Sequence, residues 1–579
     1  MNKDHAIWKV KDISSFAPWL AKDVGISEVL ASLLIQREIS SPDSARSFLF
    51  PRLAGMRDPF LIQDMDRAVE LIGAFVVKKK KITIFGDYDA DGITATALLV
   101  DFFLQLGVPV AFYIPHRIKE GYSLNEAAVR EIASDNTGLI ITVDCGIGSQ
   151  QEITLAKELG MEVIVTDHHR VPGDFKPLCP TINTLREDSA FPFRDLSGVG
   201  MAFYLSVALR AYLRDRGFFK DRQEPDMKEY LDLVALGTVA DIVQLQEENR
   251  IFVKSGLNLF MNCKRPGIRA LLNVSGIREN HSVTTDDISF RLAPRLNALG
   301  RLGPAASAVT LLTTNNETEA FLIARQMDSI NTKRQALEAR IVSEAREKIE
   351  RMENLKERRT LVLFDSGWHR GVAGIVASKI VEEYCRPTLI FAVEGELLRG
   401  SGRSINGFDL FQALSNLGDL LHHFGGHHYA AGLSIGLEKV ESFRERFEEL
   451  AREKINPEDM IPKREADCAL KLEQITPGLM KELDMLAPFG HRNPQPLFFS
   501  GPLEVVSSRI VGNGHLKLSV KEKKAVFDCI AFGKANFHPL DKEEVDILFH
   551  LETNTWQGVE SIQPVIVDLR VSPRTLSCI

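Results

Sequence analysis

Four short apolar runs, each ending in acidic or imidazole side chains, constrain the fold of this chain more than any other feature. Runs of this length suit strands buried on both faces of a parallel sheet. Open α/β sheets bind their ligands beyond the carboxyl ends of the strands, which is where these polar residues fall. An α/β fold with its chemistry at one sheet edge is therefore predicted from ITIFGDYDADG (82–92), LIITVDCG (139–146), MEVIVTDHH (161–169) and LVALGTVADIV (233–243).

The polar residues that end these runs suit a hard metal ion. Carboxylate oxygens with imidazole, and no thiolate cluster, favour Mn²⁺ or Mg²⁺. Strand side chains alternate between two faces, so the three aspartates of the first run are expected to point the same way unless a turn at 90–92 redirects the last. Carboxylates that share one pocket repel one another unless cations neutralise them. The candidate ligands are Asp87, Asp89, Asp91, Asp144, His168, His169 and Asp241.

An aspartate that follows a strand has an ordinary alternative role as the N-cap of the next helix. For any one of the four runs, that role explains the residue as well as metal binding does. The occurrence of four such runs in one chain favours the metal site.

The pattern along the chain divides it into five regions. Strand-like and helical segments alternate through the region that holds the four runs, which is typical of a catalytic βαβ domain. A charged stretch, 331–359, is expected to form a long exposed helix that spans two lobes. A second α/β region follows, and five alternating strands near the C-terminus suit an OB-like barrel. The predicted regions are an N-terminal helical extension (1–65), the catalytic domain (66–253), a helical connector (254–359), the second α/β domain (360–455) and the barrel (460–579).

Composition favours a globular protein of a reducing compartment. The 579 residues, 45% hydrophobic and 26% charged, are enough for several domains. The N-terminus lacks the apolar core of a signal peptide, and no stretch approaches the ~20 apolar residues that span a bilayer. The seven cysteines form no CxxC pair, so a cytoplasmic protein is expected. Because the net charge is −8, any contact with nucleic acid must rest on a local basic groove.

The motifs DYDADG, VDCG, TDHH and GTVADIV resemble, in order and spacing, the four motifs of the DHH phosphoesterase superfamily. The segments GWHRGVAGIVASKI (367–380), GSGRS (400–404) and FGGHHYAAG (424–432) are similar to the DHH-associated domain of its nuclease branch. The resemblance covers nearly the whole chain. It implies a metal-dependent hydrolase that degrades single-stranded DNA from the 5′ end, in DNA recombination and repair.

The resemblance also implies roles at the metal site. Two Mn²⁺ or Mg²⁺ ions bridged by Asp144 are expected to generate hydroxide from water and to stabilise the leaving oxygen. His169 is either a further ligand or a hydrogen-bond donor to a phosphoryl oxygen. Some relatives carry a histidine where this chain has Phe85, so one metal takes another ligand, such as Asp87, or an extra water. The implied ligands are Asp89, Asp91, Asp144, His168 and Asp241, and the implied catalytic residues are Asp144, His168 and His169.

Other segments are expected to hold the strand. GSGRS is interpreted as a phosphate cradle, in which the glycines let backbone N–H groups approach an anion and Arg403 adds a charge-assisted fork. For the other arginines, a salt bridge between the lobes is the alternative role. Trp368 is a candidate for base stacking, with burial in the core as its alternative. The candidate nucleic-acid-binding residues are Arg117, Tyr122, Arg295, Arg301, Ser401, Gly402, Arg403 and His427.

Three other functions share parts of this pattern. A small-molecule phosphoesterase has the metal motifs, but such relatives are shorter and usually lack the barrel. A non-enzymatic scaffold with this fold loses metal ligands, which are present here. An RNA-directed 5′ exonuclease is an open alternative, because no motif reports on a 2′-hydroxyl. The partners implied by resemblance are single-stranded DNA, a single-stranded-DNA-binding protein and a RecQ-type helicase, and we expect a monomer that does not associate with membranes.

Overall fold

A five-stranded parallel sheet forms the centre of the first lobe. In sheet order its strands are β3 (Val110–Tyr113), β2 (Ile82–Gly86), β4 (Leu139–Val143), β5 (Glu162–Thr166) and β6 (Thr181–Ile182). The structure is a computed structural model that describes residues 6–117, 119–278, 281–556 and 559–572. Every residue of β2 and β4 is buried, as expected when helices cover both faces. Three of the four motif runs therefore form parallel strands, as predicted.

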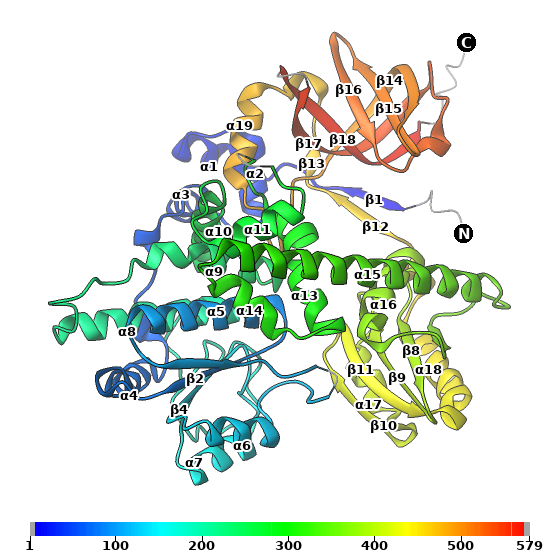
Figure 1. The fold of residues 1–579 in the computed structure, drawn as a ribbon. Coiled ribbons are helices and arrows are strands. Elements are labelled where there is room, and N and C mark those ends of the chain that lie inside the picture. Colours follow the sequence, from blue (N-terminus) through cyan, green and yellow to red (C-terminus); the bar gives the residue numbers. More distant parts are fainter. Residues whose placement is uncertain (1–5, 118, 279–280, 557–558, 573–579) are drawn as a thin grey trace, which may run out of the picture.

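Helices cover the two faces of this sheet, and the sheet separates two parts of the core (Figure 1). One face packs on α4 (Met65–Lys78), α5 (Ala90–Gln105) and α8 (Gly198–Asp215). The other face packs on α6 (Glu126–Ser134) and α7 (Gln150–Glu158). The carboxyl ends of β2, β4 and β5 consequently meet at one edge, where the motif residues follow them.

The fourth motif run is a helix, which corrects the predicted strand. Helix α9 (Leu231–Ala240) is buried from Leu231 to Val239 and packs on α5, α8 and α10 (Glu247–Phe260). A helix that is apolar on all sides has no polar stripe, so its sequence cannot be told from that of a buried strand by periodicity. Its C-cap residue, Asp241, still reaches the same edge of the sheet.

The connector is helical, but its long helix lies earlier than predicted. Helix α15 (Glu317–Glu350) has 34 residues, whereas the sequence pattern placed a long helix at 331–359. Its first half packs in the core of the first lobe and its second half in that of the second, so it runs from one lobe to the other (Figure 1). The shorter connector helices are α11 (Pro266–Val274), α12 (Thr285–Asp287), α13 (Ala293–Leu302) and α14 (Ala306–Thr313).

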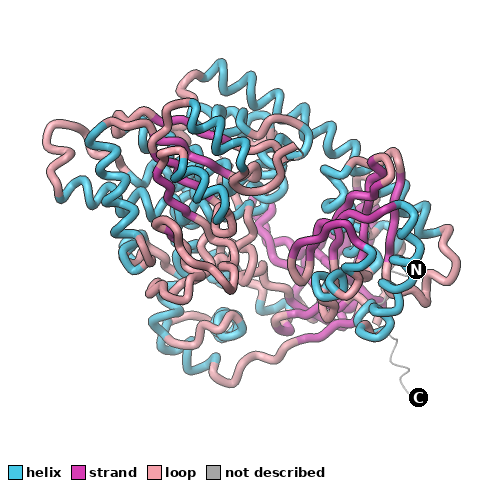
Figure 2. Tube along the Cα trace, turned by 90° about the horizontal axis from the view of Figure 1, so that it is seen from below, coloured by secondary structure: helices cyan, strands magenta, loops and turns pink. Residues whose placement is uncertain are grey.

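The second lobe contains a mixed sheet. In sheet order its strands are β10 (Leu421–Gly426), β11 (Ala430–Gly436), β9 (Leu397–Arg403), β8 (Thr388–Glu394) and β7 (Leu361–Asp365). Its β7–β8 pair is parallel and the other pairs are antiparallel. Figure 2 shows the strands of this lobe gathered apart from those of the first lobe. Its helices are α16 (Arg370–Tyr384), α17 (Leu410–Ser415) and α18 (Val440–Lys454).

The predicted C-terminal barrel is confirmed. Its strands are β14 (Phe498–Val511), β15 (His515–Glu522), β16 (Ala525–Ala531), β18 (Val559–Val571) and β17 (Glu544–Trp556). Each pairs with the next in this order, and β17 pairs back to β14, so the barrel is closed. An OB-like barrel of this kind leaves no long free edge.

The N-terminal region packs on the C-terminal region rather than standing alone. Strand β1 (Ile7–Val10) pairs in parallel with β12 (Lys463–Ala466). One core joins the barrel and α19 (Pro477–Leu486) to the N-terminal helices. These helices are α1 (Ala17–Val24), α2 (Glu28–Gln36) and α3 (Pro42–Leu49). Across the part of the chain that the structure describes, no helix combines the length and apolarity that a membrane span requires.

Candidate metal centre and nucleic-acid site

Three groups of candidate ligands meet at the carboxyl edge of the first sheet. Within each group the ligand atoms all lie within 4.8 Å of one another. Asp144 belongs to two groups and His168 to two, so the three groups are contiguous. They are Asp87 with Asp89 and Asp144, Asp144 with His168 and His169, and Asp91 with His168 and Asp241.

The aspartates of the first motif lie in a turn and a helix start, which corrects the predicted alternation along a strand. Strand β2 ends at Gly86, and α5 begins at Ala90. Asp89 is the N-cap of α5, and its Oδ1 accepts hydrogen bonds from the N–H groups of Asp91 and Gly92 at 3.0 and 3.1 Å. The N-cap role considered from the sequence is therefore real for Asp89. It uses one carboxylate oxygen, so capping and metal binding are compatible.

Asp91 is held by the N-terminus of α8. Its Oδ2 and Oδ1 accept from the N–H groups of Gly198 and Val199 at 2.5 and 2.9 Å, where the helix dipole favours a negative charge. A Cβ at Gly198 would lie 2.8 Å from Oδ1 of Asp144, and a Cβ at Gly237 would lie 2.8 Å from Oδ1 of Asp91. Glycine is therefore required at both positions for α8 and α9 to approach the carboxylates.

Three polar atoms of the site are buried and have no hydrogen-bond partner among the described residues. They are Oδ1 of Asp87, Oδ1 of Asp144 and Nε2 of His168. Nε2 of His168 lies 3.0 Å from Oδ1 of Asp144 and 3.6 Å from Oδ2 of Asp241, but the first pair is not aligned as a hydrogen bond. Buried polar atoms nearly always have partners. The donor set therefore fits divalent cations, with Asp144 placed to serve two of them.

The electrostatics of the site support the same conclusion. Burial, followed by the charge of Asp91, raises the pKa of Asp241 to about 8 and that of Asp144 well above its ordinary range. Burial, with the charge of Asp89 also contributing, raises the pKa of Asp91 to about 6 and raises that of Asp87. Carboxylates this close cannot all ionise without counter-charge. Divalent cations supply it.

Asp167, the first residue of the TDHH triplet, has a role that the sequence reasoning missed. Its Oδ1 accepts hydrogen bonds from the N–H groups of His168 and His169 at 2.8 and 3.0 Å, and lies 2.8 Å from Nδ1 of His169. Its Oδ2 accepts from the N–H of Ile147 at 2.9 Å. Although burial acts to raise its pKa, these hydrogen bonds and the histidine charges hold that pKa below its ordinary value. Asp167 therefore orients the histidines. An acid directly before two histidines was the available signal.

Phe85 fills the position at which some relatives carry a histidine. It is fully buried in β2, and its ring stacks on Tyr113 at 5.6 Å between centroids. It offers no ligand atom, and the nearby group of Asp87, Asp89 and Asp144 contains oxygen donors alone.

Two predicted substrate residues lie beside the metal groups. The hydroxyl of Tyr122 donates to the backbone carbonyl of Asp144 at 3.2 Å and lies 3.1 Å from Nδ1 of His169. Tyr122 is 48% exposed, so part of it is accessible to a ligand. The guanidinium of Arg117 lies 5.0 Å from the centre of the Tyr88 ring.

Arginines from three regions of the chain converge near this edge. Arg301 of α13 donates from Nη1 to the carbonyl of Gly371 in α16 at 3.0 Å. Burial, followed by the charges of Arg117, Arg334 and Arg403, lowers the pKa of Arg301 to about 10. Burial and the charge of Arg117 also lower the pKa of Arg403. Mutual repulsion of this kind marks a position where an anion is favourable.

Family models match the three main domains of the chain. They are described as the DHH family N-terminal domain, matching residues 81–238, the DHHA1 domain, matching 357–453, and the RecJ OB domain, matching 466–568. The single-stranded-DNA-specific exonuclease RecJ of Dickeya dadantii is 39% identical over 533 residues, which cover 89% of this chain and 92% of that protein. The chain belongs to the RecJ family. RecJ of Salmonella typhimurium is also 39% identical, over 88% of this chain and 90% of that protein.

Solved RecJ structures agree with the fold. RecJ of Thermus thermophilus in complex with Mn²⁺ superposes with a TM-score of 0.83 at 30% identity, over 99% of this chain and 80% of that chain. The Mg²⁺ complex of the same RecJ gives a TM-score of 0.78 at 29% identity, over 98% of this chain and 79% of that chain. The resemblance to the DHH superfamily and the predicted fold class are thereby confirmed.

The GSGRS segment does not form the phosphate cradle expected from the sequence. Gly400, Ser401, Gly402 and Arg403 lie in β9, which pairs with β8 on one side and β11 on the other. A Cβ at Gly400 would overlap the carbonyl oxygen of Ile390, so this glycine serves strand packing. Backbone N–H groups in a paired strand are not free to surround an anion. The side chain of Arg403 remains the candidate phosphate contact.

Three further candidates make other contacts in the structure. Arg295 forms an ion pair with Asp328 of α15 at 2.8 Å. This part of α15 and α13 pack in the core of the first lobe, so the pair lies within that lobe and is not the salt bridge between the lobes considered from the sequence. Trp368 is 5% exposed, and its Nε1 donates to Glu344 at 2.7 Å, so it belongs to the core and does not present a stacking face. His427 is exposed between β10 and β11, and its N–H donates to the carbonyl of Ala430 at 2.8 Å.

Proposed function

We propose that this protein is a single-stranded-DNA-specific 5′-to-3′ exonuclease that uses two divalent metal ions, Mn²⁺ or Mg²⁺, in DNA recombination and repair. The observation that carries the proposal is the contiguous set of ligand groups joined through Asp144 and His168, in a chain 39% identical to a single-stranded-DNA-specific exonuclease RecJ. Two adjacent metal sites of this composition are typical of enzymes that hydrolyse phosphodiesters.

The proposed metal ligands are, apart from His169, the residues whose ligand atoms converge in the three groups. When bound, the ions would activate water and stabilise charge on the phosphoryl and leaving oxygens. Asp144 would bridge them, and His168 would ligate beside it. His169 would either join the same ligand set or donate to a phosphoryl oxygen, with Asp167 fixing its ring in both cases. The ligands are Asp87, Asp89, Asp91, Asp144, His168 and Asp241, and the catalytic residues are Asp144, His168 and His169.

The converging arginines are proposed to bind the terminal 5′ phosphate. Arg117, Arg301 and Arg403 come from the first lobe, the connector and the second lobe, so an anion between them would draw all three regions together. Burial strengthens a charge-assisted hydrogen bond from a guanidinium to phosphate. Tyr122, beside His169, is placed to contact the sugar or base next to the reacting phosphate. Ser401 and His427 remain proposed contacts through their side chains, whereas Gly402 is buried in a paired strand and is no longer proposed. Arg295 is proposed to act through its ion pair with Asp328.

Selection for a single strand would be steric. The strand would pass between the two lobes, and the barrel would extend its path with sequence-tolerant contacts. We also propose a division of the chain into domains. These are a catalytic domain at 66–253, a connector at 254–359, a DHH-associated domain at 360–455 and a barrel from 460. The proposal also includes a monomeric state, a cytoplasmic location, and a single-stranded-DNA-binding protein and a RecQ-type helicase as partners.

The proposal is tested by comparing four substrates in Mn²⁺. These are a 5′-phosphorylated DNA strand labelled at its 3′ end, the matching duplex, an RNA strand of the same sequence, and pyrophosphate. We expect the single DNA strand to be shortened from its 5′ end and the other three to persist. Cleavage of RNA or pyrophosphate with DNA left intact would keep the metal centre and overturn the proposed substrate.

A further inference from the structure

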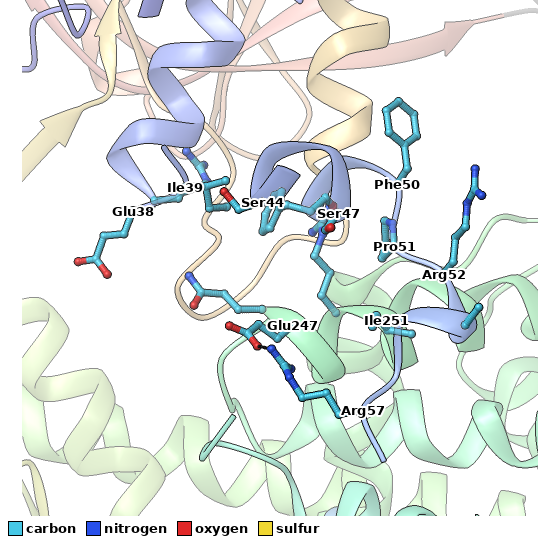
Figure 3. Close-up of a pocket in the computed structure, with 16 residues that line it drawn as sticks. Glu38, Ile39, Ser44, Ser47, Phe50, Pro51, Arg52, Arg57, Glu247 and Ile251 are labelled. Atoms are coloured by element: carbon cyan, nitrogen blue, oxygen red, sulfur yellow. Dashed lines mark hydrogen bonds and ion pairs between the residues drawn. The ribbon is translucent and has the colours of Figure 1, made fainter. Parts of the chain in front are cut away.

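A cavity apart from the metal centre lies where three parts of the chain meet. It has a volume of about 800 Å³ and is lined by the end of α2, by α3 and the segment after it, and by α10 (Figure 3). An adjoining cavity of about 240 Å³ shares Arg37, Glu38 and Gln246 with it and extends to the C-terminal region at Asp467 and Arg492. No residue that lines either cavity belongs to the metal groups or to the proposed substrate contacts.

This junction groove, defined by the two cavities, is positive in a protein whose net charge is −8. Six arginine or lysine side chains line it, against three carboxylates. Glu247 is already paired with Arg57, as Figure 3 shows. Arg57 also pairs with Glu248 and Lys11 pairs with Glu465, two carboxylates outside the lining. The positive excess therefore rests on the other four arginines, against Glu38 and Asp467. Charge of the opposite sign to that of the whole molecule favours an anionic ligand at this position.

Two of the groove's arginines are buried without a carboxylate partner among the described residues. Arg250 is 1% exposed, and its guanidinium donates to the backbone carbonyls of Phe48 and of residues 485–488. Arg37 is 7% exposed, and its three nitrogens donate to Asn493 and to the carbonyls of Leu33 and Pro494. Burial lowers the pKa of both, and the charge of Arg37 adds to the effect on Arg250. Backbone carbonyls, the ring of Phe48 at 3.7 Å from the Arg250 guanidinium and the charge of Asp467 near Arg37 offset part of their charge. A bound anion would add to this compensation.

Arg37 still has hydrogen-bonding capacity. Its Nη1 donates to Leu33 at 2.8 Å and its Nη2 to Pro494 at 2.7 Å. Each of these nitrogens carries two hydrogens, so one N–H on each is not used by those bonds. A planar fork with two spare N–H groups matches the geometry of a phosphate.

The rest of the groove suits an apolar ring. Phe48, Phe50, Pro51 and Ile251 line the larger cavity, with the hydroxyls of two serines beside them. A cavity of this size accommodates a small organic ligand such as a nucleotide. We propose that the junction groove binds a nucleoside 5′-monophosphate, with its phosphate toward Arg37 and its base on the apolar wall. The proposed exonuclease activity releases this class of compound, but the binding argument does not depend on that activity.

The binding is tested by calorimetry on the full chain in EDTA, which keeps metal-dependent binding out of the measurement. Gly55 lines the larger cavity, and a Cβ there would meet only Cδ1 of Ile251, at 3.8 Å. Gly55→Trp would therefore fill the cavity, while Gly55→Ala is a matched control. Ser47→Trp, on the exposed side of α3, is a second blocking variant.

We expect dAMP to bind the wild type, Gly55→Ala and Asp144→Asn with the same affinity. Its affinity for either blocking variant should be lower by about tenfold or more. Adenosine, which lacks the phosphate, should bind about tenfold more weakly than dAMP.

Several outcomes would overturn the proposal. Binding that is lost in Asp144→Asn but kept in both blocking variants would place dAMP at the metal centre. Equal affinity for dAMP and adenosine would show that the arginines do not recognise phosphate. Binding of a tetra-aspartate peptide without binding of dAMP would show that the groove takes an acidic polypeptide. The absence of any dAMP binding to the wild type would also refute it.

Discussion

The Nε2 atom of His168 lies 3.0 Å from Oδ1 of Asp144, yet neither atom has a hydrogen-bond partner among the described residues. Both are buried, and both belong to two of the three ligand groups. Two potential ligand atoms that lie this close, but are not aligned for a hydrogen bond with each other, are arranged to bind a cation between them. The pair therefore accounts for how one sheet edge can hold two adjacent cations.

The metal-free protein should lose stability as the pH rises. The folded-state pKa is raised to about 6 for Asp91 and to about 8 for Asp241, so the folded chain keeps protons that the unfolded chain has lost. Such a group stabilises the fold fully below its unfolded pKa and loses that effect as the pH rises through its folded pKa. The free energy of unfolding in EDTA should fall between about pH 4 and about pH 8, by roughly 1.4 kcal/mol per pH unit for each extra proton. Urea denaturation at a series of pH values measures it. A steady rise in the free energy of unfolding over that pH range would contradict the raised pKa values of the two aspartates. Saturating Mn²⁺ should remove the decrease in the free energy of unfolding.

Asp167→Asn should separate orientation from metal binding. The substitution weakens the hydrogen bonds that hold the backbone and ring of His169, so turnover should fall about 10–100-fold. Mn²⁺ stoichiometry should stay the same, because Asp167 belongs to none of the ligand groups. Single-turnover cleavage and metal titration give the two readouts. Asp174→Asn, in an exposed loop nearby, is the control and should leave both unchanged; loss of metal from Asp167→Asn would instead make Asp167 a ligand.

Arg403→Gln should act through the 5′ phosphate. Loss of one charge-assisted bond should raise the KM for a 5′-phosphorylated strand about tenfold and change the KM for a 5′-hydroxyl strand little. Arg295→Gln is the matched comparison. Because Arg295 forms an ion pair with Asp328, this substitution should lower thermal stability and leave the KM unchanged. Steady-state kinetics on the two strands distinguish them. If Arg295→Gln gave the KM effect and Arg403→Gln did not, the proposed phosphate site would be wrong.

Trp368→Phe tests a core assignment. The variant keeps an aromatic ring but loses the hydrogen bond to Glu344, so the free energy of unfolding should fall by about 1–3 kcal/mol. Affinity for single-stranded DNA should not change, because the side chain is buried. Fluorescence anisotropy with a labelled oligonucleotide checks the second expectation, and weaker binding in a stable variant would restore the stacking role.

The sequence predicted the parts of the fold that depend on local pattern. Continuous apolar runs predicted β2, β4 and β5, and alternating runs predicted the barrel strands. Burial on both faces of a strand gives a continuous apolar run, and burial on one face gives an alternating pattern. Helix α9 was missed because a helix buried on all sides has no polar stripe. The GSGRS segment was misread because its glycines are needed for packing: Gly400 lies against the carbonyl of Ile390 on a neighbouring strand, and Gly402 against the side chains of Leu389 and Leu410.

For the candidate site as well, the sequence did not report contacts between separate elements. Which residues would converge was predictable, since strand ends meet at one edge. How they converge was not, because Asp89 serves as a helix N-cap and Asp91 is held by backbone groups more than 100 residues away. Asp167 is a partial exception, because its bonds to His168 and His169 are local, and it is its bond to Ile147 that joins two separate segments. Contacts of this kind arise from packing between elements, which a single sequence does not record.

The most direct test of the account is the number of Mn²⁺ ions bound per chain, measured by calorimetric titration of the wild type and of Asp144→Asn. Because Asp144 is shared between two ligand groups, the account predicts two ions for the wild type. It predicts one ion at most for the variant, with cleavage of single-stranded DNA abolished. Two ions bound by Asp144→Asn with unchanged affinity would contradict the bridging role and the two-metal centre built on it.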